Sequence, residues 1–276
     1  MSDQPCPTYP RMNILGVGVH AIRMADALEI LSCWIEQRVK AQVVVCPVYT
    51  VMLGREDAEL GRIIASAGLV TPDGMPLVFV GHLMGYRDVE RVYGPDLMQA
   101  FCQRAAQAGY RSFLYGGAPG VAEQLAAVLT QRYPGLNIVG TYSPPFRELT
   151  PQETAEIRAQ INAAQPDVVW VGLGTPKQDK WIAANQPHLD APVLIGVGAA
   201  FDFLGSRVRQ APRWVQRSGL EWLFRLATEP RRLWRRYLVY NPLFIAGILM
   251  QLLGLRRYEL AGGEPADSAR GGGSGG

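Results

Sequence analysis

The segment TPDG at residues 71–74 carries the carboxylate that is best placed to act as a catalytic base. A Pro-Asp-Gly turn needs no function, because proline fixes φ, aspartate bonds its own backbone and glycine supplies a positive φ. In an open α/β sheet, however, ligands bind at the carboxyl ends of the strands. With a strand at 41–48 and a helix at 55–67, we expect Asp73 at the rim of such a loop, either as a turn residue or as a base that accepts a proton.

An arginine, Arg91, lies farther along the chain, shortly before a Gly-Pro pair that is typical of a helix start. A guanidinium there can clamp a diphosphate through two parallel hydrogen bonds, although a lone arginine is more often a surface residue. Asp96, just inside the helix, is best explained as a partner of the helix dipole. Asp73 and Arg91 are therefore the candidate catalytic residues.

Two glycine-rich loops follow apolar runs and can bring backbone amides close to a phosphate or a sugar. The first contains Gly116 and Gly117, and its alternative is a plain turn, because loose glycine patterns are weak signals. The second groups two glycines, a hydroxyl, a cation and an amide, and its alternative is an ordinary loop with a solvated lysine: Gly172, Gly174, Thr175, Lys177 and Gln178. The strand end at 196–202 is best explained by close packing of small residues, although Asp202 can still face the site.

The motifs of several cofactor-dependent classes are missing. The sequence has no complete GxGxxG fingerprint, no Walker lysine and no GxSxG elbow. Its three histidines are far apart, and no DxD triplet can hold a cation against a sugar diphosphate. We therefore expect neither a metal nor a cofactor. The four cysteines are scattered without a CxxC pair, which indicates reduced thiols of a cytosolic protein and neither a disulfide nor a zinc site.

Short apolar runs alternate with amphipathic stretches as far as Ala200. The predicted strands, several of them continuously apolar as in a parallel sheet covered on both faces, are 41–48, 77–81, 111–117, 136–142, 167–174 and 192–199. The predicted helices are 24–40, 95–109, 120–134 and 151–165. This alternation predicts an α/β fold, a Rossmann-like three-layer sandwich with a mostly parallel sheet.

The pattern changes beyond residue 205. Between Arg207 and Arg236, nine arginines face only two glutamates, a net charge of +7 that leaves −4 on the rest of a chain whose total is +3. Tryptophans are interleaved with these arginines, as in an interfacial helix on anionic lipid. The alternative is a helical bundle that packs its tryptophans on the core and leaves its arginines solvated.

The apolar run at 243–255 is interrupted by Gln251 and is shorter than the roughly 18 residues of a spanning helix. It is a candidate for the lipid interface or for a contact in a homo-oligomer. We therefore divide the chain into an α/β core at 1–205, a helical, basic appendage at 206–258 and a linker-like, disordered tail at 259–276.

Five blocks of the sequence, in order and without large gaps from about 14 to 238, resemble the WecG/TagA/CpsF glycosyltransferases (glycosyltransferase family 26). The blocks are TPDGMPLVF, ERVYGPDLM, FLYGGAPGVAEQLA, VGLGTPKQDKWI and GVGAAFDFLGSRVRQAPRWVQRSGLEWLFRL. They are most similar to the exopolysaccharide branch that includes the xanthan-type enzymes. The resemblance implies a Rossmann-like core and a C-terminal appendage that helps to bind the membrane and to complete the active site.

The same resemblance implies an inverting transfer of a sugar from a nucleotide diphosphate, usually UDP, to a polyprenyl-diphosphate-linked sugar. It implies a peripheral protein at the cytoplasmic face of the bacterial inner membrane. The exopolysaccharide branch favours UDP-glucose as the donor. The alternative within the family is transfer of an N-acetylmannosamine-type sugar.

The family's proposed base aspartate matches Asp73, its substrate-contacting arginine matches Arg91, and its nucleotide-side glutamine matches Gln178. Where relatives carry a threonine after an early strand, this chain has Cys46, which lacks a strong hydroxyl donor, and Thr50 is the candidate replacement. The appendage residues expected to contact the membrane or the acceptor diphosphate are Arg207, Arg209, Arg213, Arg217, Trp214 and Trp222.

An inverting transfer needs one base and a means to stabilise the departing diphosphate, which without a metal falls to Arg91, backbone amides and appendage arginines. Two other classes stay open. A Rossmann oxidoreductase that uses a nicotinamide cofactor lacks its fingerprint. An arginine-rich nucleic-acid binder would leave Asp73 and the 172–178 loop without a role, so we expect no nucleic-acid partner.

Overall fold

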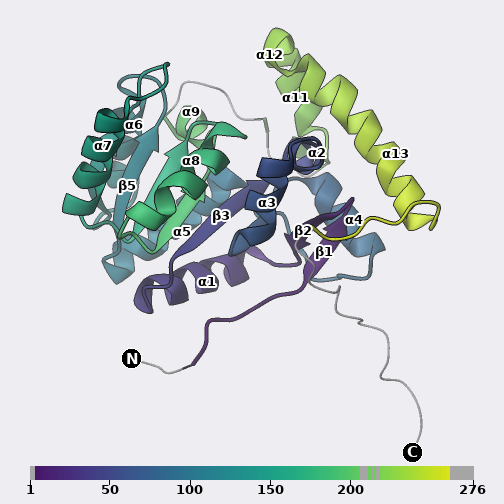
Figure 1. Cartoon of the computed structure of the whole chain (residues 1–276), viewed down its shortest axis with the longest axis horizontal. Coiled ribbons are helices and arrows are strands. Elements are labelled where there is room, and N and C mark those ends of the chain that lie inside the picture. Colours follow the sequence, from purple (N-terminus) through teal and green to yellow (C-terminus); the bar gives the residue numbers. More distant parts are fainter. Residues whose placement is uncertain (1–3, 206–210, 213, 216–217, 262–276) are drawn as a thin grey trace, which may run out of the picture.

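The centre of the protein is a six-stranded sheet in which neighbouring strands run parallel (Figure 1), in the order β4-β3-β8-β7-β5-β6. The computed structural model describes residues 4–205, 211–212, 214–215 and 218–261. The strands are β3 (Ala41–Cys46), β4 (Leu69–Pro72), β5 (Arg111–Gly116), β6 (Asn137–Tyr142), β7 (Val168–Gly172) and β8 (Val193–Gly196). The predicted α/β class is confirmed.

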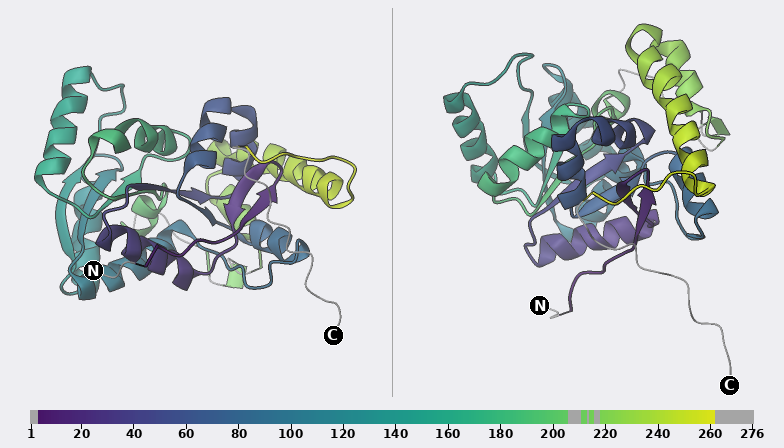
Figure 2. Two further views of the ribbon diagram at one scale, coloured as in Figure 1. Left: turned by 60° about the horizontal axis from the view of Figure 1, so that its bottom comes forward. Right: turned by 45° about the vertical axis from the view of Figure 1, so that its right-hand side comes forward.

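Helices cover both faces of the sheet (Figure 2), which explains why its strands are apolar on both sides. One face packs against α1 (Met24–Glu36), α5 (Gly94–Ala108), α6 (Val121–Arg132) and α9 (Ala200–Leu204). The other face packs against α7 (Pro151–Ala163) and α8 (Lys177–Asn185) at one end, and against α2 (Val48–Glu56) and α3 (Ala58–Ser66) at the other. A short 3-10 helix, η1 (Gln186–His188), follows α8. The predicted three-layer sandwich is confirmed.

The four predicted helices are present as α1, α5, α6 and α7, and α7 shows how local sequence defines one. The Thr150 hydroxyl accepts a hydrogen bond from the Glu153 amide at 3.2 Å, and the Glu153 carboxylate accepts one from the Thr150 amide at 2.8 Å. Pro151 lies in the first turn. This capping box satisfies amides that a helix start otherwise leaves unpaired.

The run LVFVG at 77–81 is a helix, and its prediction as a strand is wrong. It lies within α4 (Met75–Leu83), which begins after Gly74 and has Pro76 in its first turn. A short, continuously apolar run does not by itself distinguish a buried strand from a buried helix. The strand in this region is instead β4, which had not been predicted and which pairs with β3.

An N-terminal hairpin and the C-terminal helix pack together beside β3 and β4. The hairpin consists of β1 (Arg11–Ile14) and β2 (Val17–His20). The C-terminal helix α13 (Tyr240–Leu252) inserts Tyr240, Phe244 and Ile248 into the apolar cluster that contains the hairpin. Gln251 donates to the Asn13 carbonyl at 2.7 Å and accepts from the Leu15 amide at 2.9 Å. The residue that interrupts the apolar run therefore ties α13 to the hairpin.

Most of the predicted appendage between residues 221 and 239 is helical. It contains α11 (Glu221–Thr228), α12 (Pro230–Trp234) and a π-helical turn, η2 (Arg235–Val239), which leads into α13. The described start of the predicted disordered tail, 259–261, is attached to the hairpin, because the Ala261 amide donates to the Gly16 carbonyl at 3.1 Å. The remainder of that tail lies outside the described residues.

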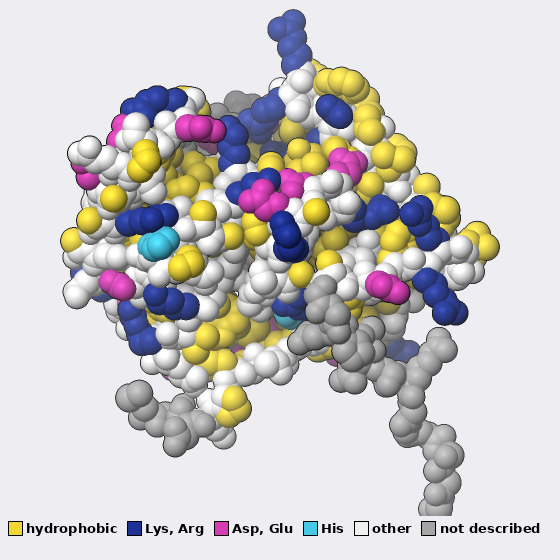
Figure 3. Space-filling view, viewed as in Figure 1, with side chains coloured by type: hydrophobic (Ala, Val, Ile, Leu, Met, Phe, Trp, Pro, Cys, Tyr) yellow, Lys and Arg dark blue, Asp and Glu magenta, His cyan; other side chains and the backbone are white. Residues whose placement is uncertain are grey.

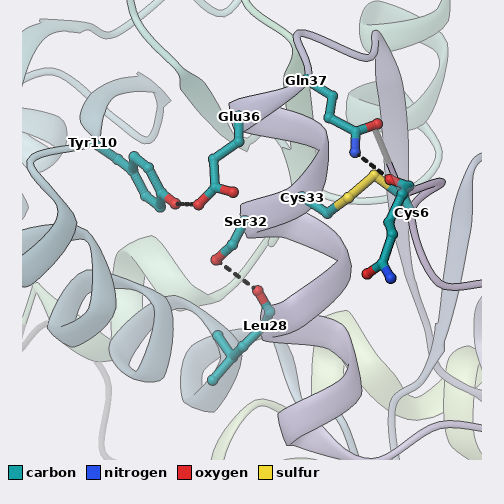
Figure 4. Close-up of a disulfide and its surroundings, with 8 residues drawn as sticks. Cys6, Leu28, Ser32, Cys33, Glu36, Gln37 and Tyr110 are labelled. Carbon is teal, nitrogen blue, oxygen red and sulfur yellow. Dashed lines mark hydrogen bonds between the residues drawn. A yellow bond between two sulfur atoms is a disulfide. The ribbon is translucent and has the colours of Figure 1, made fainter. Parts of the chain in front are cut away.

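Two of the four cysteines form a disulfide, which corrects the prediction of four reduced thiols. The N-terminal segment runs beside α1 and brings Cys6 and Cys33 to a Cα–Cα distance of 5.7 Å (Figure 4). Next to it, the Gln37 side chain donates to the Gln4 carbonyl at 2.7 Å. No spacing motif joins the two cysteines, so only the folded chain reveals the pair. The other two, Cys46 and Cys102, are buried free thiols.

Candidate active site

A pocket opens at the carboxyl ends of β3 and β4. The core supplies the loop after β3, the turn Asp73–Pro76 after β4, and the side chains of Arg91 and Tyr93. The opposite wall comes from the C-terminal segment, between Gly219 and Asn241. The pocket thus lies where parallel α/β sheets bind ligands, and distant residues of the chain complete it.

Asp73 lines this pocket and is held there by the turn that the sequence predicted. Pro72 ends β4, the Asp73 amide donates to the Cys46 carbonyl at 3.1 Å, and Gly74 adopts a φ of +119° before α4 begins. Burial raises the pKa of Asp73 from 3.8 to about 6, Arg91 opposes this shift, and Glu221 adds to it. A carboxyl with a pKa near neutrality is well suited to accept a proton in a reaction.

Arg91 is brought beside Asp73 by hydrogen bonds of its neighbour in the chain. The Val92 amide donates to the Pro72 carbonyl at 3.0 Å, and the Thr71 hydroxyl donates to the Val92 carbonyl at 3.2 Å. The Arg91 guanidinium lies 4.0 Å from the centroid of the Tyr93 ring and pairs with the Glu221 carboxylate at 2.5 Å. Burial lowers the pKa of Arg91, but the nearby carboxylates outweigh it and the net shift is upward.

Two further arginines reach the pocket from the C-terminal segment. The Arg225 guanidinium lies 5.2 Å from the centroid of the Phe203 ring, and that of Arg236 lies 4.6 Å from the Tyr49 ring. Burial lowers the pKa of Arg236. Both belong to the basic segment whose arginines were expected as a group to help stabilise the diphosphate, but neither was named individually, because nothing in their spacing distinguishes them from the other arginines of that run.

The pocket has an excess of positive charge and of unused hydrogen-bond donors. Among the residues that the structure describes, its lining has three arginines and two carboxylates, Asp73 and Glu221. The Nε atoms of all three arginines and the Tyr93 hydroxyl are buried without a hydrogen-bond partner among the described residues. Since buried donors are normally satisfied, this arrangement is suited to an anion with many acceptor oxygens, such as a diphosphate.

Cys46 and Thr50, the two candidates for the family's threonine, do not line the pocket as the described residues form it. Cys46 is fully buried at the end of β3, and burial raises the pKa of its thiol. Thr50 is fully buried in α2, and its hydroxyl has no hydrogen-bond partner among the described residues. Their substrate contacts stay predictions.

The glycines at the ends of β5 and β7 lie in close contact with their surroundings. Gly116 has a φ of +136°, and a Cβ there would lie 2.6 Å from the Gly172 carbonyl oxygen. At Gly117 a Cβ would lie 2.7 Å from the Val121 side chain, and at Gly172 it would lie 2.5 Å from the Phe201 ring. Close packing explains these glycines, and their predicted contacts with substrate remain untested.

The loop after β7 forms hydrogen bonds within itself. The buried Gln178 side chain accepts from the Gly174 amide at 3.0 Å and donates to the Thr175 hydroxyl at 3.4 Å. Lys177 is exposed, and Asp202 is half-buried in α9. None of these residues lines the Asp73 pocket as the described residues form it, so the structure does not bring this predicted group together with Asp73 and Arg91 in one cavity.

A second buried carboxyl, Asp179, was missed by the sequence analysis. Burial raises its pKa to about 6, and the Thr175 hydroxyl opposes this shift in part. Neither carboxylate oxygen has a partner in good hydrogen-bond geometry among the described residues. The available signal was helical spacing, because Asp179 lies three residues before the buried Ile182 and therefore on the inner face of α8.

The structure describes two of the six residues predicted to contact the membrane or the acceptor diphosphate. Trp222 lines the pocket, and Trp214 is exposed; Arg207, Arg209, Arg213 and Arg217 lie outside the described residues. Figure 3 shows hydrophobic side chains gathered along the right-hand side of the molecule, over α13, with lysine and arginine beside them. The exposed apolar residues of α11 and α13 include Leu223, Leu243, Ile245, Leu249 and Leu252. No helix in the described parts of the chain is long and apolar enough to span a bilayer.

The family to which the chain belongs follows from two kinds of comparison. Residues 12–258 match the family model described as "Glycosyl transferase WecG/TagA/CpsF family". The chain is 33% identical over 187 residues to the N-acetylglucosaminyldiphosphoundecaprenol N-acetyl-beta-D-mannosaminyltransferase of Bacillus spizizenii, which covers 68% of this chain and 70% of that protein. It is 30% identical over 226 residues to the protein of the same name from Bacillus subtilis, which covers 82% and 85%.

The family model, over residues 12–258, spans the core, the Asp73 pocket and the C-terminal segment that closes it. The matches confirm the resemblance drawn from the five sequence blocks, and they establish that the protein is a glycosyltransferase. The chain belongs to the WecG/TagA/CpsF family of glycosyl transferases.

Proposed function

We propose that this enzyme transfers an N-acetylmannosamine-type sugar from UDP to an N-acetylglucosamine that is linked through a diphosphate to a polyprenol. Both relatives are named for a transfer of this kind. They favour the N-acetylmannosamine alternative and give no support to UDP-glucose, the donor that the exopolysaccharide-like blocks suggested. The observation that carries the proposal is the convergence of Asp73 with three arginines in one pocket at the strand ends.

In this proposal Asp73 is the general base of a single displacement. The acceptor hydroxyl oxygen attacks the anomeric carbon of the donor sugar while its proton passes to the Asp73 carboxylate. The bond between the anomeric carbon and the diphosphate oxygen breaks, UDP leaves with the bonding electron pair, and the anomeric configuration is inverted. Arg91, Arg225 and Arg236 stabilise the negative charge that develops on the departing diphosphate.

The proposed reaction needs no metal ion, because the three guanidinium groups supply the positive charge that a metal would bring to a diphosphate. The described residues also contain no group of three His, Cys, Asp or Glu side chains that could hold one. Transfer activity should be the same in EDTA as in added Mg²⁺. A strict requirement for a divalent cation would contradict this part of the proposal.

We further propose that the enzyme is a peripheral protein that rests α11 and α13 on the cytoplasmic membrane surface, where a lipid-linked acceptor lies. Exposed apolar side chains on these helices lie beside basic ones, the pattern of an interfacial segment on anionic lipid. The same segment forms one wall of the Asp73 pocket. A homo-oligomer through α13 is the competing use of this surface, and light scattering with and without anionic liposomes separates the two.

The decisive experiment is a donor panel. The purified enzyme is given an N-acetylglucosaminyl-diphosphate lipid with UDP-N-acetylmannosamine, UDP-N-acetylglucosamine or UDP-glucose, and products are identified by mass spectrometry. We expect product from UDP-N-acetylmannosamine alone, whereas a hexosyl product would restore the glucose assignment. A thermal shift with UDP, but not with NAD or an oligonucleotide, is expected as well, and the reverse would favour an oxidoreductase or a nucleic-acid binder.

A further inference from the structure

Glu221, the first residue of α11, forms an ion pair that joins the C-terminal segment to Arg91 in the core wall of the pocket. Its carboxylate pairs with the Arg91 guanidinium, and both side chains are well enclosed, with 14% of Arg91 and 16% of Glu221 exposed. An acidic residue in the first turn is also a favourable partner of the helix dipole, which accounts for a carboxylate at this position but not for its pairing with Arg91. The pairing is the feature that needs explanation.

A carboxylate on Arg91 occupies the kind of position that a phosphate oxygen would take. Carboxylates and phosphates both present acceptor oxygens to the guanidinium fork with the same geometry and charge sign. Around the pair, Arg225 and Arg236 retain buried Nε atoms without partners among the described residues, so the pocket has capacity for more anionic oxygens than Glu221 supplies. A diphosphate bound there would meet Glu221 as a like charge at short range, which is unfavourable in a partly buried site.

We propose that Glu221 is a positioning residue that pairs with Arg91 in the substrate-free enzyme. When a diphosphate binds, its oxygens replace the Glu221 carboxylate as the partner of Arg91. The ion pair keeps the guanidinium stacked on Tyr93 and directed into the pocket, where it is ready for substrate. It also joins α11 to the core next to Asp73. This inference rests on the proposed function, since it takes the ligand of the pocket to be a diphosphate.

The same exchange affects the base. Within the described parts of the chain, the charged groups that act most strongly on Asp73 are Arg91, Glu221, Arg236 and Arg225, and Asp73 in turn acts on the Tyr93 hydroxyl and the Cys46 thiol. Glu221 is the carboxylate among them that raises the pKa of Asp73. Removing its charge should therefore lower the pH at which Asp73 becomes an active base in the free enzyme.

The test compares Glu221→Gln with the wild-type enzyme and with Glu229→Gln. The glutamine keeps the size of the side chain and one acceptor oxygen but loses the charge. Glu229 is a matched control, because it pairs with Arg232 at 2.9 Å in the same part of the chain and does not line the pocket as the described residues form it. Calorimetric titrations with UDP and, separately, with farnesyl diphosphate distinguish the donor diphosphate from the acceptor diphosphate as the ligand that displaces Glu221.

We expect Glu221→Gln to bind one of these diphosphates about five-fold or more tightly than wild type, because a competing negative charge is gone. The acid limb of the kcat/KM profile, which reports the free enzyme, should move down by about half a pH unit or more. Glu229→Gln should change neither quantity. Glu221→Asp, which keeps the charge, should return both toward the wild-type values, and thermal melts of all variants check that they are folded.

Two results would overturn the inference, and they can be told apart. If wild type binds UDP and transfers sugar but Glu221→Gln binds both diphosphates equally or more weakly, Glu221 is a structural contact and the proposed function stands. If neither protein binds either diphosphate, the inference and the diphosphate-binding part of the proposed function fail together.

Discussion

The Asp73 pocket and the loop after β7 both lie at the carboxyl edge of the sheet, but they differ in how their polar groups are used. In the loop, Gln178 is bonded to Gly174 and Thr175 within a few residues of itself. In the pocket, the Nε atoms of three arginines stay buried without partners among the described residues, although the side chains come from distant parts of the chain. Satisfied polar groups are typical of a structural role, whereas several buried donors without partners, gathered in one open pocket, are suited to a ligand.

Asp179, in α8 beside this loop, is a polar side chain whose carboxylate oxygens have no hydrogen-bond partner among the described residues. Like Asp73, it is a carboxyl whose pKa burial raises to about 6. Unlike Asp73, it is fully enclosed and does not line the pocket as the described residues form it. Two carboxyls with similar pKa values can thus be compared in the same protein, one open to a substrate and one closed.

The largest effect is expected for Asp73→Asn. If Asp73 takes the proton of the acceptor hydroxyl, its loss should lower kcat about 10²- to 10⁴-fold, the usual contribution of a general base. Binding of UDP, measured by calorimetry, should stay within a few-fold of wild type, because the three arginines remain. Asp179→Asn is the matched control and should keep most of the activity per folded molecule. Full transfer activity in Asp73→Asn would rule out Asp73 as the base.

The second-largest effect, smaller than that of Asp73→Asn, is expected for Arg236→Gln. Lys177→Gln is its control. Loss of a charged donor to a diphosphate costs about 1.5–3 kcal/mol, which is roughly a 10- to 150-fold loss of affinity for the diphosphate that Arg236 binds. Lys177 is exposed in the loop after β7, so its substitution should change affinity less than two-fold. Calorimetry with UDP and farnesyl diphosphate measures both. A larger loss of diphosphate affinity in Lys177→Gln than in Arg236→Gln would indicate that the diphosphate binds at the loop after β7 and not in the Asp73 pocket.

The smallest effect concerns stability. The folded-state pKa values of Asp73 and Asp179, both about 6, lie above the ordinary 3.8, so the folded protein binds more protons than the unfolded chain between these values. The stabilisation is complete below about pH 4 and is lost as the pH rises through 6. At pH 8, Asp73→Asn and Asp179→Asn should each raise the free energy of unfolding by about 1–3 kcal/mol, because the cost of a buried charge is removed.

Urea denaturation at pH 8 and at pH 4 checks this expectation. The gain should disappear at pH 4, where the wild-type carboxyls are protonated. A variant that is less stable than wild type at pH 8 would mean that its carboxylate has favourable partners in the folded protein and that the raised pKa is wrong for that residue.

Sequence reasoning succeeded where a local signal was strong. The runs at 41–48 and 167–174 are strands of a parallel sheet, and Thr150 with Glu153 starts a helix, because burial pattern and capping chemistry act over a few residues. It failed for 77–81, whose continuous apolar run suits a buried strand and a buried helix equally. It also missed the Cys6–Cys33 disulfide, because the approach of the N-terminal segment to α1 is a tertiary contact.

The residues of the candidate site also fall into those with a local sequence signal and those without one. Asp73 could be found from its turn and Arg91 from its position before a helix start, because each signal lies within a few residues, whereas β4, the strand that Asp73 follows, was not predicted. Arg225, Arg236 and Glu221 could not be chosen from the basic segment, since no period or motif says which arginines of that run point inward.

The sequence by itself therefore determined the alternating α/β core, the turn that holds Asp73 and the presence of a basic, aromatic segment at the other end of the chain. Only the tertiary structure decided that residues 219–241 fold back over the ends of β3 and β4 and place two arginines and one glutamate beside Asp73 and Arg91. The physical reason is that side-chain periodicity records which face of an element is buried, whereas the partner across a long-range contact depends on how the whole chain packs.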